Sequence, residues 1–239
     1  MTTQSRQLPT IKTWHIVVFG VVCTLLLGSL AIRLIDNAKF SPIAIDPTGL
    51  SDLEVSAIEK AIEPIGAVQF FAADLTAIHQ AVSKLSWAQS VEVRRDWHHG
   101  VTVSATPRIA VANFGSDQLL DADGVVFTPA DVRMTNNPKL VYLYGHAEES
   151  KIIMQQTKRL NTWFAPLKMT VKDVILTPRK TWVVVFHNGM RVIVDHENAE
   201  QKLYNLSIHL STSLKNELNK IQSADLRYKN GFVIAYKTA

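Results

Sequence analysis

The hydrophobic residues of this chain follow three patterns in turn. Residues 16–32 form one uncharged apolar stretch. Residues 51–85 place apolar residues three and four positions apart, which is helical spacing, and from residue 91 onwards many segments alternate apolar and polar residues as strands do. The patterns therefore predict a membrane segment followed by an α+β body.

The uncharged stretch approaches the length of a membrane span, which is about 20 residues. We predict a transmembrane helix over residues 14–35 behind a cytoplasmic tail of residues 1–13. A cleaved signal peptide is an alternative because Gly28–Ala31 resembles a weak cleavage site, although its apolar region would be only about 7–15 residues long. A buried core helix is a third interpretation, which the apolarity on all sides disfavours. Arg6 and Lys12 favour a cytoplasmic N-terminus, with the body in the periplasm of a bacterium that has two membranes.

Residues 36–115 are predicted to fold as a β-α-α-β-β unit. Ser51 and Glu54 form a capping box at the start of one helix, and Asp74 opens a second. The strands are expected at 40–45, 91–97 and 101–105, with a turn at 98–100. This order predicts a three-stranded sheet with both helices on one face.

Residues 116–239 are predicted to form a second unit, an antiparallel sheet with helices. The dipeptides at 123–124 and 188–189 are hairpin signals. We expect one long helix over residues 198–221. The remaining predicted elements are a helix at 147–164 and strands at 119–122, 125–127, 140–145, 171–176, 181–187, 190–196, 224–228 and 232–236.

The charge and the cysteine content of the chain limit the functions that it can have. Of 25 basic residues three lie in residues 1–35, which hold no acidic residue, so the rest of the chain is nearly neutral and no nucleic-acid partner is predicted. Cys23 is the only cysteine, which excludes an intrachain disulfide. No hydrolase elbow, zinc motif or phosphate loop occurs, so we predict no catalytic residue, cofactor, metal or small-molecule substrate. Adjacent His98 and His99 are favoured as a turn over a metal site.

The last sixteen residues predict a terminal strand, and an edge strand offers unpaired main-chain groups to another chain. Phe232, Ile234 and Tyr236 would share one face, and Val233 and Ala235 the other. From composition alone, the apolar residues here are ordinary core and Arg227 is solvated. For Arg94-Arg95, alternation turns one side chain outward, either to solvent or to a partner.

Six motifs in order resemble the FtsQ/DivIB family of bacterial cell division proteins. They are Leu85-Ser86-Trp87, residues 91–97, 101–112, 120–127, 179–182 and 225–232. The first unit looks like a POTRA domain and the second like the family's β-domain. Ser86 departs from a usual proline, Thr106 from a glutamate, and Asp195-His196 from a Gly-Arg pair.

The resemblance implies a non-enzymatic scaffold of the divisome, enriched at the division septum. It implies that the terminal strand binds FtsB and FtsL by strand addition, with further contacts to FtsK, FtsW, FtsI and other division proteins. The implied partner-binding residues are Asp225, Leu226, Arg227, Tyr228, Lys229, Asn230, Gly231, Phe232, Val233 and Ala235. Arg94, Arg95 and Trp97 are the implied recruitment surface of the POTRA domain.

Two other functions fit the sequence less well. A membrane-anchored POTRA protein of secretion or outer-membrane assembly would normally have several POTRA units or a barrel. An anchored wall hydrolase would need a clustered catalytic pair, and none is visible in the sequence.

Overall fold

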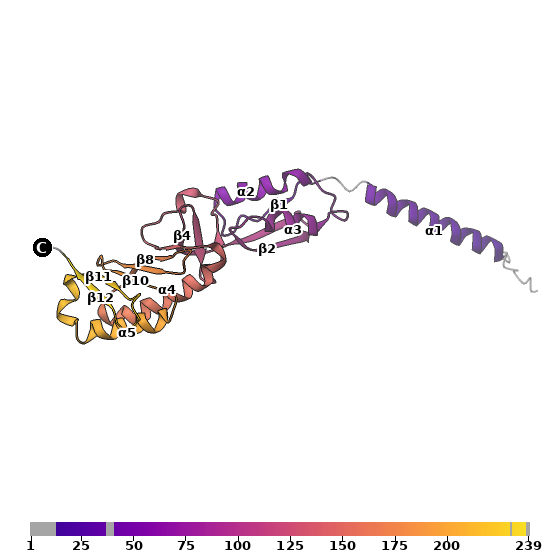
Figure 1. Ribbon diagram of the computed structural model, residues 1–239. Helices are drawn as coiled ribbons and strands as arrows, with labels where there is room; N and C mark the ends of the chain where they lie inside the picture. Colours follow the sequence, from indigo (N-terminus) through magenta and orange to yellow (C-terminus); the bar gives the residue numbers. More distant parts are fainter. Residues whose placement is uncertain (1–12, 37–40, 230, 238–239) are drawn as a thin grey trace, which may run out of the picture.

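A computed structural model of the protein describes residues 13–36, 41–229 and 231–237 (Figure 1). Most of the predicted tail, residues 1–12, lies outside the described residues, as does Asn230. Helix α1 covers Thr13–Asp36. Within the described residues, no helix combines the length and the apolar character that crossing a membrane requires.

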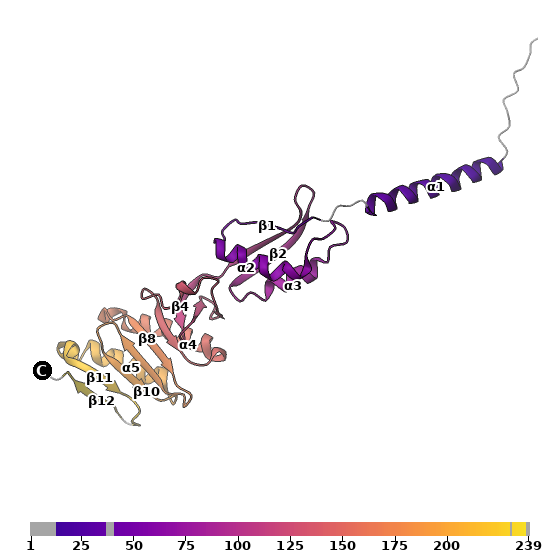
Figure 2. The same cartoon turned by 90° about the horizontal axis from the view of Figure 1, so that it is seen from above.

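A three-stranded sheet in the order β1-β3-β2 forms the first unit (Figure 2). β1 (Ala44–Ile45) runs parallel to β3 (Gly100–Pro107), and β2 (Ala88–Asp96) runs antiparallel to it. Helices α2 (Asp52–Ile62) and α3 (Leu75–Ser83) pack against the sheet and each other. The predicted β-α-α-β-β order is confirmed.

Local signals explain where these helices begin and end. The Ser51 hydroxyl accepts a bond from the Glu54 amide, and the Glu54 carboxylate accepts one from the Ser51 amide, so the capping box is complete. The Asp74 carboxylate accepts bonds from two amides of the first turn of α3. Gly66, at φ +69°, follows the short 3₁₀ helix η1 (Glu63–Ile65) that extends α2.

A nine-stranded sheet in the order β12-β11-β10-β9-β8-β7-β4-β5-β6 forms the second unit. Its strands are β4 (Ala110–Phe114), β5 (Gln118–Asp121), β6 (Val126–Phe127), β7 (Val141–Tyr144), β8 (Val171–Leu176), β9 (Trp182–Phe186), β10 (Arg191–Val194), β11 (Ile221–Asp225) and β12 (Val233–Tyr236). Helices α4 (Ser150–Phe164) and α5 (Ala199–Ser211) lie along one face of this sheet (Figure 1). Short 3₁₀ helices occur at Val132–Met134 (η2), Ala147–Glu149 (η3), Ala165–Leu167 (η4) and Lys215–Lys220 (η5).

The second unit is predicted as a mixed antiparallel β-domain with helices, and the structure shows that its sheet also contains parallel pairs. The pairs β4–β7, β7–β8 and β10–β11 are parallel, and the remaining pairs are antiparallel. Parallel neighbours need a crossover, and helices α4 and α5 supply two of them. The second unit is therefore a mixed α+β domain.

The predicted helix over residues 198–221 is wrong, because α5 ends at Ser211. The Ser211 and Thr212 hydroxyls both bond back to the Ile208 carbonyl, and Thr212 leaves the helical region at φ −114°, ψ −88°. Such back-bonding competes with the helix. The chain continues as η5 and enters β11 at Ile221.

The predicted strand at residues 224–228 begins earlier than expected, since β11 covers Ile221–Asp225. The Asp225 carboxylate accepts a bond from the Arg227 amide, which turns the chain out of the strand. Leu226 is nevertheless buried, and its amide still bonds to the Ile193 carbonyl of β10.

The second sheet begins a few residues before residue 116, where the second unit is predicted to start. β4 pairs with β5 and β7, so the second sheet already begins at Ala110. Leu119 and Phe127 of that sheet belong to the hydrophobic core of the first unit. The two sheets therefore share apolar contacts at their junction.

Candidate partner-binding edge

β12 is the edge strand of the nine-stranded sheet. It pairs antiparallel with β11, and no further strand lies beyond it in the part of the chain that the structure describes. The predicted terminal strand is confirmed, and the structure places it at the edge of the sheet. Such an edge carries main-chain donors and acceptors that another strand can pair with.

The hydrogen bonds of β12 show which groups face outward. The Lys237 amide donates to the Lys220 carbonyl at 2.8 Å, so the main-chain groups of Lys237 point toward η5 and β11. Main-chain groups alternate in direction along an antiparallel strand. Those of Val233 and Ala235 therefore point toward β11, and those of Ile234 and Tyr236 face the open edge.

Side chains on β12 divide between its two faces as predicted. Phe232 and Ile234 pack against the core of the second unit. Val233 is 52% exposed, and Ala235 is exposed as well. The strand is therefore anchored through the face of Phe232 and Ile234. The face of Val233 and Ala235 stays free to cover an incoming chain.

Contacts with η5 hold the end of β12. The Tyr236 hydroxyl donates to the Glu217 carboxylate, which raises the pKa of Tyr236 above its usual value. The Lys237 ammonium donates to the Asn219 carbonyl at 3.0 Å. β11 has a register shift between Ile221 and Ser223, opposite this end of β12. The edge is held in place although it is the last element of the chain.

The segment before β12 combines one buried and several exposed residues. Leu226 is 3% exposed and belongs to the core, so it is not available to a partner. Tyr228 is 56% exposed, and Lys229 and Gly231 are also exposed. The Arg227 guanidinium pairs with the Asp225 carboxylate at 2.7 Å, a bond that lowers the pKa of Asp225.

A basic groove lies on the same sheet, where β11 separates its strands β9 and β10 from β12. Arg179, Arg191 and Arg227 line it, together with residues of the β8–β9 turn and of β9 and β10. Arg179 and Arg191 are exposed. Sequence reasoning missed Arg191 as a site residue because only the order β9-β10-β11 brings these arginines together. The feature of the sequence that could have pointed to Arg191 is its position as a basic residue shortly after the Asn188-Gly189 turn.

The predicted recruitment surface lies on the first sheet, apart from β12 (Figure 1). Arg94 is exposed and Trp97 is 80% exposed. Arg95 differs from them, because its guanidinium donates to the carbonyls of Phe70 at 2.8 Å and Ala73 at 2.9 Å. Arg95 therefore supports the loop after η1, which the sequence did not predict.

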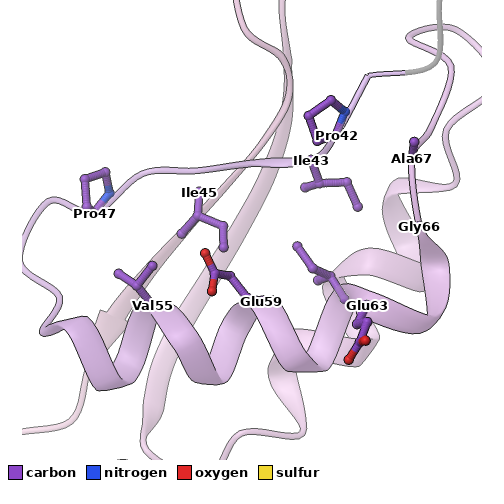
Figure 3. Close-up of a pocket in the computed structure, with 10 residues that line it drawn as sticks. Pro42, Ile43, Ile45, Pro47, Val55, Glu59, Glu63, Gly66 and Ala67 are labelled. Atoms are coloured by element: carbon purple, nitrogen blue, oxygen red, sulfur yellow. The ribbon is translucent and has the colours of Figure 1, made fainter.

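Other surfaces offer little chemistry. Figure 3 shows a groove between β1 and α2 in which Glu59 points toward the strand and Glu63 away from it. Its other walls are mostly apolar. The His99 ring contacts the Asp96 carboxylate at 3.2 Å in the predicted turn. No group of three or more His, Cys, Asp or Glu residues suited to a metal is found in the described residues.

These features define a class of protein: a two-sheet α+β body whose larger sheet ends in an open C-terminal strand. The family model for the C-terminal domain of the cell division proteins FtsQ/DivIB matches residues 109–227, from β4 to the end of the Asp225–Arg227 turn. This chain belongs to the FtsQ/DivIB family of cell division proteins.

Individual relatives match a longer part of the chain. The cell division protein FtsQ of Acinetobacter oleivorans is 35% identical over 189 residues, 79% of this chain and 66% of the relative. FtsQ of Burkholderia pseudomallei is 30% identical over 169 residues, 69% of this chain and 67% of the relative. FtsQ of Neisseria meningitidis is 29% identical over 163 residues, 68% of each chain. The chain thus spans about two thirds of the length of these relatives.

Proposed function

We propose that this protein is a non-enzymatic scaffold of the divisome at the septum, which links early and late division proteins. It binds the FtsB–FtsL pair by adding a strand of the partner to β12. The observation that carries this proposal is the open edge of β12, where main-chain groups of Ile234 and Tyr236 face outward. Strand addition gains affinity from main-chain hydrogen bonds and specificity from side chains.

Charge supports the choice of an acidic partner segment. The basic groove of Arg179, Arg191 and Arg227 reaches the segment before β12 through Arg227, and guanidinium groups bind carboxylates well. Tyr228 is 56% exposed in the segment before β12, and tyrosine is enriched among residues that dominate binding energy. A partner strand with acidic residues at its start or end would complement both features.

We also propose that residues 14–35 anchor the chain in the inner membrane, with residues 1–13 in the cytoplasm. Support comes from the uncharged stretch at 16–32 and from the basic residues Arg6 and Lys12 before it. Exposed apolar side chains along α1, such as Phe19, Leu25 and Leu30, favour a lipid environment over water. The first sheet would then be a periplasmic POTRA-type module, with recruitment of FtsK-like partners through exposed β2 residues such as Arg94.

A binding titration tests the strand addition. The full chain in detergent is titrated with the periplasmic parts of FtsB and FtsL, using Tyr236→Pro and Tyr236→Ala as a matched pair. Both variants lose the phenol ring, but only proline also removes the amide that faces the open edge. We expect Tyr236→Ala to weaken binding mildly and Tyr236→Pro to abolish it.

The comparison needs a check on folding, supplied by circular dichroism and urea unfolding of both variants. Val233→Pro would be a poor substitute, because the Val233 amide points toward β11 and its loss would damage the sheet itself. Equal binding by folded Tyr236→Pro and Tyr236→Ala would exclude strand addition at β12.

A further inference from the structure

Three aromatic residues gather at one end of the first sheet, and we call Phe70, Phe71 and Trp97 the aromatic cluster. The Phe70 ring lies 4.9 Å from the Trp97 ring and 5.0 Å from the Phe71 ring, between centroids. Phe71 is 63% exposed and Trp97 is 80% exposed. Large aromatic side chains that are this exposed and touch one another form an apolar surface that water solvates poorly.

The cluster is held in position by polar contacts beneath it. The Arg95 guanidinium bonds to the Phe70 and Ala73 carbonyls, which fixes the loop that carries both phenylalanines. The Asp96 carboxylate accepts bonds from the His98 amide at 2.8 Å and the His99 amide at 3.1 Å, which fixes the turn after Trp97. The exposed rings are therefore carried by a loop and a turn that hydrogen bonds hold in place.

The cluster lies next to the point where the chain enters the first sheet. Ser41 and Val68 exchange two main-chain hydrogen bonds, each 3.0 Å long, two residues before Phe70. Ser41 and Pro42 line a groove with Phe70, Phe71 and Trp97. The aromatic rings are therefore close neighbours of the first described residues after α1.

The chain between α1 and the cluster is short. Four residues separate Asp36, the last residue of α1, from Ser41. Five Cα–Cα steps of about 3.8 Å reach at most about 19 Å. If α1 spans the membrane as proposed above, the cluster cannot be much farther than this from the outer surface of the bilayer.

We propose that the aromatic cluster docks into the headgroup region of the outer leaflet of the bilayer that holds α1. This inference rests on the membrane anchor of the proposed function. Trp side chains favour the membrane–water interface, where the indole ring is apolar and its N–H reaches a hydrogen-bond acceptor. Phe71 adds apolar area beside it. In the docked state Trp97 contacts lipid, and Arg94 stays available to protein partners.

Docking at this point would set the orientation of the whole body. The first sheet would be tied to the membrane twice, by the short connection from α1 and by the aromatic cluster. Two attachments restrict the rotation of the sheet more than one connection does. The long axis of β3 would lead from the membrane toward the second unit.

The test uses the full chain reconstituted in vesicles of phosphatidylethanolamine and phosphatidylglycerol. In a Cys23→Ser background, a polarity-sensitive fluorophore is attached at Phe71→Cys or, as the matched control, at Ile109→Cys. Ile109 is 78% exposed and lies just beyond the far end of β3 from Gly100, about 23 Å along the strand. Brominated lipids report contact with the bilayer, and flotation after carbonate extraction reports insertion of the anchor.

We expect the label at position 71 to shift its emission to shorter wavelength and to be quenched several-fold more by brominated lipid than the label at 109. A Trp97→Ser change added to the first variant is expected to reduce that quenching. Equal, weak quenching of both labels in chains that float would overturn the docking while leaving the anchor intact. Weak quenching of both labels, together with protection of the label at position 71 when division proteins are added, would show that the cluster contacts protein rather than lipid. Chains that fail to float would overturn the anchor itself.

Discussion

The Ser86 hydroxyl and the Thr128 main chain form two reciprocal hydrogen bonds. The hydroxyl donates to the Thr128 carbonyl at 3.2 Å and accepts from the Thr128 amide at 3.1 Å. Ser86 lies between α3 and β2, and Thr128 directly follows β6, so these bonds join the two units. A proline at this position would have no hydroxyl, so the junction depends on the serine.

Ser86→Ala should therefore weaken the junction. Loss of the hydroxyl leaves the Thr128 amide and carbonyl without this partner, and we expect a decrease of about 1 kcal/mol in the free energy of unfolding. Urea unfolding of the full chain measures it. Ser90→Ala, at an exposed position of β2, serves as the control and should change stability little. Equal effects of both substitutions would show that the junction bonds contribute nothing specific.

Asp121 should make stability depend on pH at the same junction. Burial alone would raise the pKa of Asp121, but bonds from the Val125 amide, the Arg108 guanidinium and the Asp123 amide together lower it. A carboxyl whose pKa is lower when folded stabilises the fold above its unfolded pKa of about 3.9 and loses that contribution as pH falls through the folded pKa.

Unfolding free energies from pH 7 to pH 3 measure this effect. Asp121→Asn is expected to be less stable than the unmodified chain at pH 7, by about 1–3 kcal/mol, since the partly buried Arg108 loses its charged partner. The two curves should converge toward pH 3. A constant difference in unfolding free energy between the two proteins across this range would mean that the charge of Asp121 does not contribute to stability.

Arg95 and Arg94 should respond differently to the same change. Arg95→Lys removes the fork that bonds two carbonyls of the loop after η1, and we expect faster amide hydrogen exchange in residues 69–73 and a loss of about 1 kcal/mol in stability. Arg94→Lys, one position away and exposed, is expected to leave both unchanged. Similar exchange in the two variants would contradict the supporting role of Arg95.

Gly124 is required for two reasons that a pair of variants can separate. Its φ is +79°, and a Cβ there would lie 2.9 Å from the Lys151 Cα. Gly189 has φ +85° in the other hairpin turn but open space around it. Gly189→Ala should cost about 1 kcal/mol, and Gly124→Ala clearly more, because main chain of α4 must also move. Thermal unfolding compares them, and equal losses would remove the packing argument.

Much of the first unit could be predicted because its signals are local. The capping box at Ser51, the cap at Asp74 and the turn at His98–Gly100 each act within a few residues. The terminal strand itself was also predicted, from alternation and turn chemistry, whereas its place at the edge depends on the order of strands in the sheet.

The predictions that failed concern features that depend on contacts between distant residues or on a local change of backbone geometry. Apolar spacing continues past Ser211, yet α5 ends there and Thr212 leaves the helical region. The parallel β10–β11 pairing is set by packing of α5 and cannot be read from either strand. The basic groove was missed for the same reason, since Arg191 and Arg227 are distant in sequence.

The nine-stranded sheet has two unequal ends. β12 presents four residues, whereas β6 at the opposite end has only two, one of them the buried Phe127. Growth of a fibre by repeated joining of sheets needs a complementary edge at each end. Among the described strands of this sheet, a strand that joins β12 therefore finds no edge of equal length at the opposite end. Within this sheet, that inequality favours discrete complexes over open-ended polymers.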